Sequence, residues 1–239
     1  MFCPAVFLAG ASAMSRKSER AVILLSGGLD SATALYLARR QGYECHCLIM
    51  DYAQRHRKEV FAARRIAKAA GARFQIVRLE FPWKGSALTD MKIAVPSQRA
   101  LFRIGRGIPP TYVPARNTVF LSLALGFSEA IGASRLFIGA NALDFSGYPD
   151  CRPDYYRAFQ RVARLGTKTG AEGKTIRVET PLIRMSKKEI IRLGRRLGVP
   201  YELTWSCYQG RRVPCGRCDS CILREKGFRE AGWPDPSLS

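Results

Sequence analysis

Apolar residues gather in short unbroken runs along this chain, and the first run predicts a buried strand. Residues 21–25 read Ala-Val-Ile-Leu-Leu, a pattern typical of a strand that is covered on both faces of a parallel sheet. The run ends at residues 26–28, Ser-Gly-Gly, and Asp30 and Ser31 then favour the start of a helix. We therefore predict a strand, a glycine turn and a helix that continues to residue 40.

Apolar runs and amphipathic stretches alternate along the rest of the chain. Further strands are predicted at residues 43–50, 73–81, 135–140 and 176–182. Further helices are predicted at residues 58–70, 118–131, 154–165, 186–197 and 222–230. Strands that alternate with helices indicate an α/β fold with a doubly wound parallel sheet. In such a sheet the ligand binds at the carboxyl ends of the strands.

The length of 239 residues suits one α/β domain, which we place at residues 21–200, followed by a small segment at 201–239. Residues 1–20 are expected to form an N-terminal extension. Its apolar stretch has no preceding lysine or arginine, so it lacks the charged region of a signal peptide. No apolar run approaches the ~20 residues that cross a membrane, so we expect a cytoplasmic protein.

Residues 26–31, Ser-Gly-Gly-Leu-Asp-Ser, are the strongest candidate for a binding site. Two glycines let the backbone approach an anion, and the amides and dipole of the following helix hold its charge. For Ser-Gly-Gly alone, an ordinary strand-to-helix turn is the alternative. The full hexapeptide resembles the loop of the PP-loop ATP pyrophosphatases, which split ATP between its α- and β-phosphates.

The resemblance to PP-loop enzymes implies roles for individual residues. Asp30 would hold Mg²⁺ or orient the pyrophosphate, and Ser26 would donate to a phosphate oxygen, so both are candidate catalytic residues. The expected ATP contacts are Leu25, Ser26, Gly27, Gly28, Leu29, Asp30, Ser31, Ala32, Thr33, Ala34, Leu35 and Asp51.

Four of the eight cysteines crowd into one polar loop near the C-terminus, with the spacing Cys207-x7-Cys215-x2-Cys218-x2-Cys221. Four thiolates in a short loop suit tetrahedral Zn²⁺. Such a zinc ion is structural, because no ligand position stays open for water. An iron–sulfur cluster is the alternative metal centre. We therefore predict that residues 201–239 form a zinc-binding segment.

The formal net charge is +20, from 39 basic and 19 acidic residues, which indicates an anionic partner. The basic residues are scattered over the predicted helices rather than gathered in one run. We therefore expect small anionic ligands and no nucleic-acid partner.

Two polar segments near the ends of predicted strands are candidates to bind a second substrate. Arg116 offers a bidentate fork for a carboxylate or phosphate, and Asn117 offers an amide for a base edge. In the loop that follows the fourth strand, Asp144 or Asp150 would accept hydrogen bonds from a guanine-like ring, and Tyr148 would stack on it. The remaining loop residues assigned to the substrate are Ser146 and Arg152. A capping asparagine and an Asx-turn loop are the alternatives.

These motifs occur together and in order. They are residues 26–31, 51–56 (Asp-Tyr-Ala-Gln-Arg-His), 113–117 (Val-Pro-Ala-Arg-Asn), 146–153 (Ser-Gly-Tyr-Pro-Asp-Cys-Arg-Pro), 181–190 (Pro-Leu-Ile-Arg-Met-Ser-Lys-Lys-Glu-Ile) and the four cysteines. The set resembles the 7-cyano-7-deazaguanine synthases over residues 20–233.

This resemblance implies an enzyme of queuosine precursor biosynthesis. Such an enzyme converts 7-carboxy-7-deazaguanine and ammonia to the nitrile through adenylated intermediates, with ATP, Mg²⁺ and a structural zinc ion. We also expect a homodimer. The competing predictions are a PP-loop enzyme that modifies tRNA, of the thiolase or lysidine synthetase type, and a zinc-ribbon module that binds nucleic acid. No RNA-binding domain is visible in support of the first, and the second leaves the phosphate loop unexplained.

Overall fold

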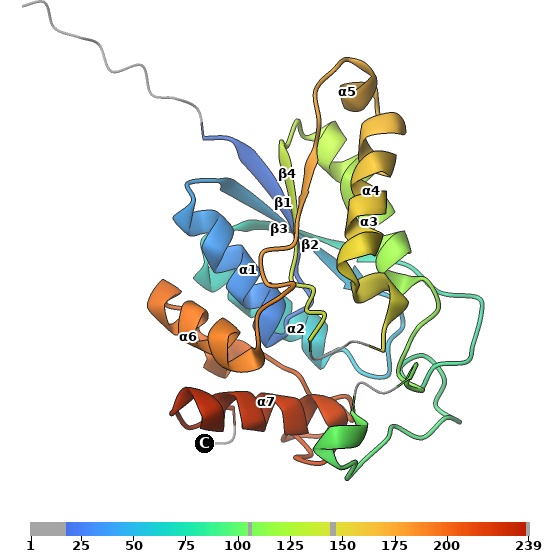
Figure 1. Ribbon diagram of the computed structural model, residues 1–239, viewed down its shortest axis with the longest axis vertical. Helices are drawn as coiled ribbons and strands as arrows, with labels where there is room; N and C mark the ends of the chain where they lie inside the picture. Colours follow the sequence, from blue (N-terminus) through green and yellow to red (C-terminus); the bar gives the residue numbers. More distant parts are fainter. Residues whose placement is uncertain (1–17, 105–106, 144–146, 238–239) are drawn as a thin grey trace, which may run out of the picture.

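The computed structural model describes residues 18–104, 107–143 and 147–237. Most of the expected N-terminal extension lies outside these residues, and so do Asp144 and Ser146 of the predicted substrate loop. A five-stranded parallel sheet organises the described chain (Figure 1). In the sheet order β3-β2-β1-β4-β5, the strands are β3 (Arg73–Arg78), β2 (Glu44–Asp51), β1 (Arg20–Leu24), β4 (Arg135–Ile138) and β5 (Arg177–Glu179). The predicted doubly wound parallel sheet is confirmed.

Helices follow the strands on both sides of the sheet (Figure 1). They are α1 (Leu29–Arg40), α2 (Lys58–Ala69), α3 (Arg116–Ala130), α4 (Pro153–Leu165), α5 (Lys168–Ala171), α6 (Lys187–Leu197) and α7 (Asp219–Ala231). Short 3₁₀ turns lie at Leu101–Arg103, Pro149–Cys151 and Tyr201–Leu203. Within the described ranges, no helix has the length and apolar content of a membrane span.

Neighbouring side chains of the central strands enter two separate cores, because successive residues of a strand point to opposite faces. Ile23 packs in one core with Leu35 of α1 and Ile190 of α6. Leu24 packs in the other core with Leu121 of α3. Burial on both faces explains why the sequence shows an unbroken apolar run instead of an alternating one.

Three strands are shorter than predicted. The third strand ends at Arg78 rather than at residue 81, because its neighbour β2 ends at Asp51. The amide of Leu79 makes the last bond of this pair, to the carbonyl oxygen of Asp51 at 3.0 Å. The fourth and fifth strands likewise close at Ile138 and Glu179.

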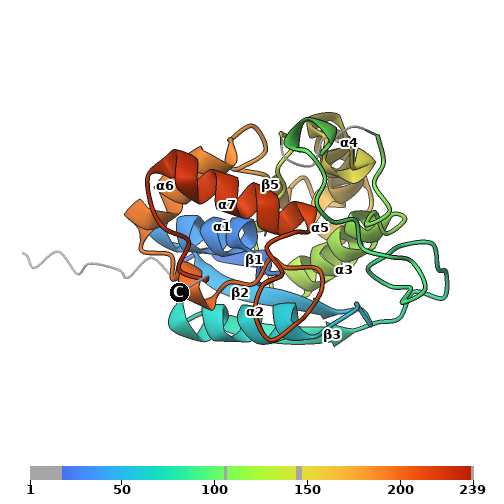
Figure 2. The same ribbon diagram turned by 90° about the horizontal axis from the view of Figure 1, so that it is seen from below.

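The C-terminal segment packs directly on the α/β domain. Helix α7 lies beside α6 in both views (Figures 1 and 2), and Phe228 of α7 shares a core with Leu35 and Ile190. The buried guanidinium of Arg224 forms a two-point ion pair with Asp235, at 2.7 and 2.9 Å. The division of the chain at residue 200 stays a prediction.

Candidate active site

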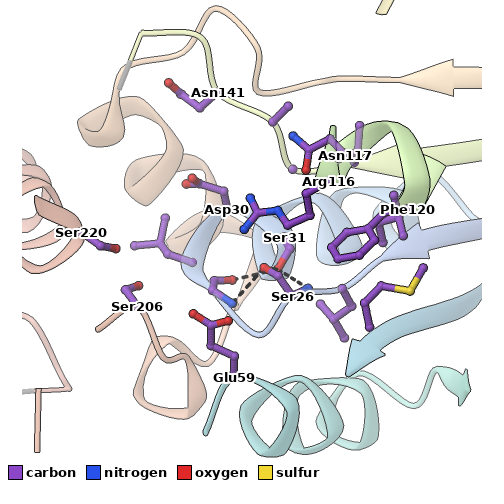
Figure 3. Close-up of a pocket in the computed structure, with 18 of the residues that line it drawn as sticks. Ser26, Asp30, Ser31, Glu59, Arg116, Asn117, Phe120, Asn141, Ser206 and Ser220 are labelled. Carbon is purple, nitrogen blue, oxygen red and sulfur yellow. Dashed lines mark hydrogen bonds between the residues drawn. The ribbon is translucent and has the colours of Figure 1, made fainter. Parts of the chain in front are cut away.

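Residues 26–31 form the turn between β1 and α1. Gly28 is the N-cap residue, and α1 begins at Leu29. The side chains of Ser26 and Ser31 stabilise the turn (Figure 3). Their Oγ atoms lie 2.9 Å apart, and the Ser31 hydroxyl donates to the carbonyl oxygen of Gly28 at 3.1 Å. The first amides of an α-helix have no acceptor inside the helix. Together with the helix dipole they favour an anion at this turn.

Two glycines permit close backbone approaches around this turn. Gly27 has a φ of +86°, and a Cβ atom there would collide with the carbonyl oxygen of Glu59 in α2. At Gly139, which follows β4, a Cβ atom would lie 2.6 Å from the amide nitrogen of Ser31. The turn at residues 26–31, the proposed phosphate loop, is therefore held between α2 and the end of β4. The amide of Trp205 also donates to the carbonyl oxygen of Gly27, at 2.9 Å.

Asp30 forms an ion pair that the sequence did not predict. The Nζ atom of Lys187 lies 2.9 and 2.8 Å from the two carboxylate oxygens of Asp30. Lys187 is the first residue of α6, which begins with a capping box between Ser186 and Glu189. Helix α7 supports the lysine, because a Cβ atom at Gly227 would lie only 2.9 Å from Cβ of Lys187. The pair is nearly buried, with 10% and 15% of the two side chains exposed.

A cavity of about 1370 Å³, which includes space open to solvent, lies over the phosphate loop. Its polar and charged lining residues are Ser26, Asp30, Ser31, Gln54, Glu59, Arg116, Asn117, Asn141, Lys187, Ser206, Ser220 and Arg224. Figure 3 shows many of these side chains converging on one space from several elements. Its aromatic lining residues are Tyr52, Phe120, Tyr148, Trp205 and Tyr208.

Arg116 presents a cation to this cavity from the first residue of α3. Its guanidinium donates to the hydroxyl of Tyr52 at 3.3 Å and lies 6.0 Å from the ring centre of Phe120. Among the described residues, no carboxylate oxygen lies within ion-pair distance of this guanidinium. A half-buried arginine without a carboxylate partner is suited to bind an anionic ligand.

Asn117 and Asp150 contact one another. The Asp150 carboxylate accepts a hydrogen bond from the Asn117 amide at 3.1 Å, and the Asn117 side chain donates to the Asp150 carbonyl oxygen at 3.3 Å. Asp150 is 6% exposed, and it does not line the cavity, whereas Asn117 does. This carboxylate therefore stabilises the N-terminus of α3. Its predicted contact with the substrate stays a prediction.

We expect Asp150→Ala to lower the free energy of unfolding by about 1–3 kcal/mol, because a buried amide of α3 loses its acceptor. Urea denaturation measures this loss. Asp154→Ala is the matched control, since 83% of its side chain is exposed, and its stability should change by less than about 0.5 kcal/mol. Unchanged stability of Asp150→Ala with weakened substrate binding would support the predicted substrate contact instead.

The other predicted substrate residues lie in different places. Tyr148 lines the cavity, and its hydroxyl is 2.7 Å from that of Thr111. Arg152 is exposed and precedes α4 as its N-cap residue. Burial raises the pKa of the cavity-lining Cys151 thiol to about 12, so the thiol is neutral near pH 7. The substrate contacts of Tyr148 and Arg152 stay predictions, as do those of the two loop residues outside the described ranges.

Not all of the predicted ATP contacts reach the cavity. Leu25, Ser26 and residues 28–31 line it. Residues 32–35 are buried in the core, where Leu35 and its neighbours hold α1 in place. Asp51 lies outside the lining and pairs with Arg57 at 2.8 Å. Contact of any of these residues with ATP stays a prediction.

The four cysteines converge on one point. Their sulfur atoms all lie within 4.8 Å of one another. Tetrahedral zinc with bonds of about 2.3 Å places its sulfur ligands about 3.8 Å apart. The distances of 3.5 Å from Cys218 to Cys221 and 4.0 Å from Cys215 to Cys221 agree with this geometry. The donor set therefore fits one metal ion with four sulfur ligands.

The cysteine segment forms one wall of the cavity. Trp205, Ser206 and Tyr208 flank Cys207 in the sequence, and all three line the cavity. The Nε2 atom of His56 lies 2.9 Å from the carbonyl oxygen of Cys207, which links this segment to the start of α2. A metal bound to Cys207 would therefore fix the position of its three neighbours.

The long insertion at residues 82–115 also reaches the cysteine segment. Arg99 binds the Asp219 carboxylate at two points, 3.0 and 2.6 Å away. The amide of Gln98 donates to the carbonyl oxygen of Arg217 at 2.8 Å. The insertion contributes Leu88 to the cavity lining.

The profile of the family Queuosine biosynthesis protein QueC matches residues 20–232. This chain belongs to that family. A protein of Nostoc punctiforme named 7-cyano-7-deazaguanine synthase is 59% identical over 219 residues, which cover 91% of this QueC chain and 98% of the relative. Relatives of the same name from Anaeromyxobacter dehalogenans and Saccharophagus degradans are 56% and 55% identical over 224 residues, 92% of this chain in each case and 96% and 97% of the relatives. The predicted family is confirmed.

Among the charged residues of the cavity that sequence reasoning on this QueC chain missed are Lys187 and Glu59. Both lie in the first turn of a helix that follows a strand, so both stand at the carboxyl edge of the sheet. A lysine at the positive end of a helix is unfavourable by itself, and this signal could have identified Lys187. Glu59 gave no such signal, because an acid at a helix start is ordinary.

Proposed function

We propose that this QueC chain is a 7-cyano-7-deazaguanine synthase, which makes the nitrile from 7-carboxy-7-deazaguanine, ammonia and ATP. The carrying observation is that a phosphate loop and the Arg116 guanidinium face the same cavity. The loop suits a triphosphate, and the arginine suits a second anion such as a carboxylate. The names of the relatives, which this chain matches over nearly their full lengths, support the proposal.

The first activation converts a carboxyl oxygen of the substrate into a leaving group. The substrate carboxylate attacks the α-phosphorus of ATP, pyrophosphate departs, and an acyl adenylate forms. The amides at the start of α1 and the ammonium of Lys187 stabilise the negative charge of the departing pyrophosphate. Asp30 is the carboxylate that we assign to a Mg²⁺ ion, which would neutralise phosphate charge when ATP is bound.

Ammonia then attacks the acyl carbon, and the loss of AMP and a proton leaves an amide. The amide oxygen attacks a second ATP, and pyrophosphate departs again. Loss of AMP and protons from this adduct leaves the nitrile. Both activations use the same loop. Because each activation consumes one ATP, each nitrile requires two ATP and releases two AMP.

The metal of the four-cysteine site is proposed to be a structural Zn²⁺. The four sulfur ligands would complete a tetrahedral shell and would leave no position for water or substrate. The role of this zinc ion is to hold the cavity wall around Cys207 in place. The homodimer and the cytoplasmic location also stay proposals.

We expect AMP and the nitrile to form when the protein is mixed with ATP, Mg²⁺, ammonia and 7-carboxy-7-deazaguanine, with no RNA present. Liquid chromatography with mass detection should find two AMP for each nitrile. Omission of ammonia should abolish the nitrile. AMP formation that requires tRNA and yields no nitrile would contradict the proposal and support a tRNA-modifying enzyme.

A further inference from the structure

Two carboxylates line the cavity in the described part of the chain, and their surroundings differ. Asp30 is held by the ammonium of Lys187. Glu59 lies in the first turn of α2. Its carboxylate accepts no hydrogen bond and forms no ion pair with any described residue. Figure 3 shows Glu59 reaching from α2 toward the phosphate loop.

The environment of Glu59 disfavours a lone negative charge. Burial raises the pKa of its carboxyl to about 7, and the nearby charge of Arg116 only partly opposes this rise. A half-buried carboxylate without donors gains strong, charge-assisted hydrogen bonds from a ligand that brings N–H groups to it.

The phosphates of ATP cannot supply these donors, because they are anionic acceptors. A guanine-like edge can, because its ring N–H and its exocyclic amine point the same way and match the two oxygens of a carboxylate. Aromatic side chains in the same cavity, among them Tyr208 and Trp205, offer surfaces for a flat ring. A deazapurine acid also carries an anionic carboxylate, for which Arg116 is the available cation.

We propose that Glu59 is the residue that recognises the deazapurine, by accepting hydrogen bonds from its ring N–H and exocyclic amine. This inference rests on the proposed function. It assigns to Glu59 the hydrogen bonds to the guanine-like ring that were predicted for Asp144 or Asp150. The Asp150 carboxylate accepts a hydrogen bond from the backbone amide of Asn117. The substrate then lies with its amine edge at α2 and its carboxylate at Arg116, beside the phosphate loop.

Calorimetric titration of Glu59→Gln with two ligands tests this inference. The ligands are 7-carboxy-7-deazaguanine and its analogue without the exocyclic amine. The wild type should bind the analogue about tenfold more weakly than the acid, as expected for one charge-assisted hydrogen bond. Glu59→Gln should bind the acid about 10–100-fold more weakly than the wild type and should bind both ligands within about threefold of each other.

Three controls separate recognition from damage to the fold. Glu59→Gln should keep its melting temperature, its metal content and its affinity for a non-hydrolysable ATP analogue. Glu80→Gln, at an exposed position after β3, should bind every ligand as the wild type does. If Glu59→Gln fails to fold, Glu59→Asp keeps the carboxylate and should retain the preference for the acid over the analogue.

The outcomes distinguish the two proposals. If the wild type makes the nitrile but Glu59→Gln discriminates between the ligands as the wild type does, the inference on Glu59 is wrong and the proposed function stands. Normal affinity for the acid with a raised KM for ammonia would also overturn it, and would indicate proton transfer. If the wild type neither binds the acid nor makes the nitrile, the proposed function itself fails.

Discussion

Asp30→Ala is expected to abolish ATP turnover while the fold is retained. The Asp30 carboxylate lies at the start of α1, where the substrate phosphates are proposed to bind, and Lys187 holds it in place. Loss of a preorganised polar group at the reacting centre costs about 10²–10³ in rate. Ser26→Ala should have a similar effect, because the Ser26 hydroxyl both braces the loop and faces the cavity. AMP release measured by chromatography gives the rates.

Lys187→Ala and Glu172→Ala complete this experiment. Lys187→Ala removes the partner of Asp30 and a cation near the phosphates, so it should raise the KM for ATP and lower kcat together. Glu172→Ala changes an exposed acid after α5, far along the chain from the loop, and should behave as the wild type. Wild-type AMP release by both Asp30→Ala and Ser26→Ala would reject the assignment of the phosphate loop.

The parts of the fold that local physics controls were predictable from the sequence. An unbroken apolar run followed by Ser-Gly-Gly indicates a buried strand and a tight turn, and both lie where expected, at β1 and residues 26–28. The alternation of strands and helices indicated the doubly wound sheet, in which β1 and β4 are neighbours. The spacing of four cysteines indicated a cluster of sulfur atoms. Each of these features is set by residues close together in the sequence or by a general rule of chain topology.

The partners of charged side chains were not predictable, because they come from distant segments. Asp30 meets Lys187 across 157 positions. The Asp150 carboxylate, for which a substrate contact is predicted, accepts from the backbone amide of Asn117 across 33 positions. The sequence shows which residues carry charge but not which charges neutralise each other. The unpaired ones, Arg116 and Glu59 among the described residues of the cavity, are identified only once the fold is known.

Cys218→Ser is expected to lose the metal and to destabilise the protein. Cys218 is fully buried, and its sulfur lies 3.5 Å from that of Cys221, so serine replaces a soft thiolate ligand at the centre of the cluster. Structural zinc sites contribute roughly 10 kcal/mol or more to the folding of small domains. A loss of about 3 kcal/mol would already lower the melting temperature of a chain of this size by about 6–12 °C.

The loss of the metal should also weaken the binding of both substrates. Trp205, Ser206 and Tyr208 line the cavity beside Cys207, and the Trp205 amide holds the carbonyl of Gly27 in the phosphate loop. A loosened cysteine segment should therefore raise the KM for both ATP and the deazapurine acid.

Elemental analysis, calorimetry and steady-state kinetics of Cys218→Ser measure these three effects. Cys47→Ala is the control, because Cys47 is equally buried but lies in β2, where its loss should lower stability and leave one zinc ion per chain. Full zinc content in Cys218→Ser would contradict the four-cysteine site. Stoichiometric iron with visible absorbance in the wild type would replace the zinc ion by an iron–sulfur cluster.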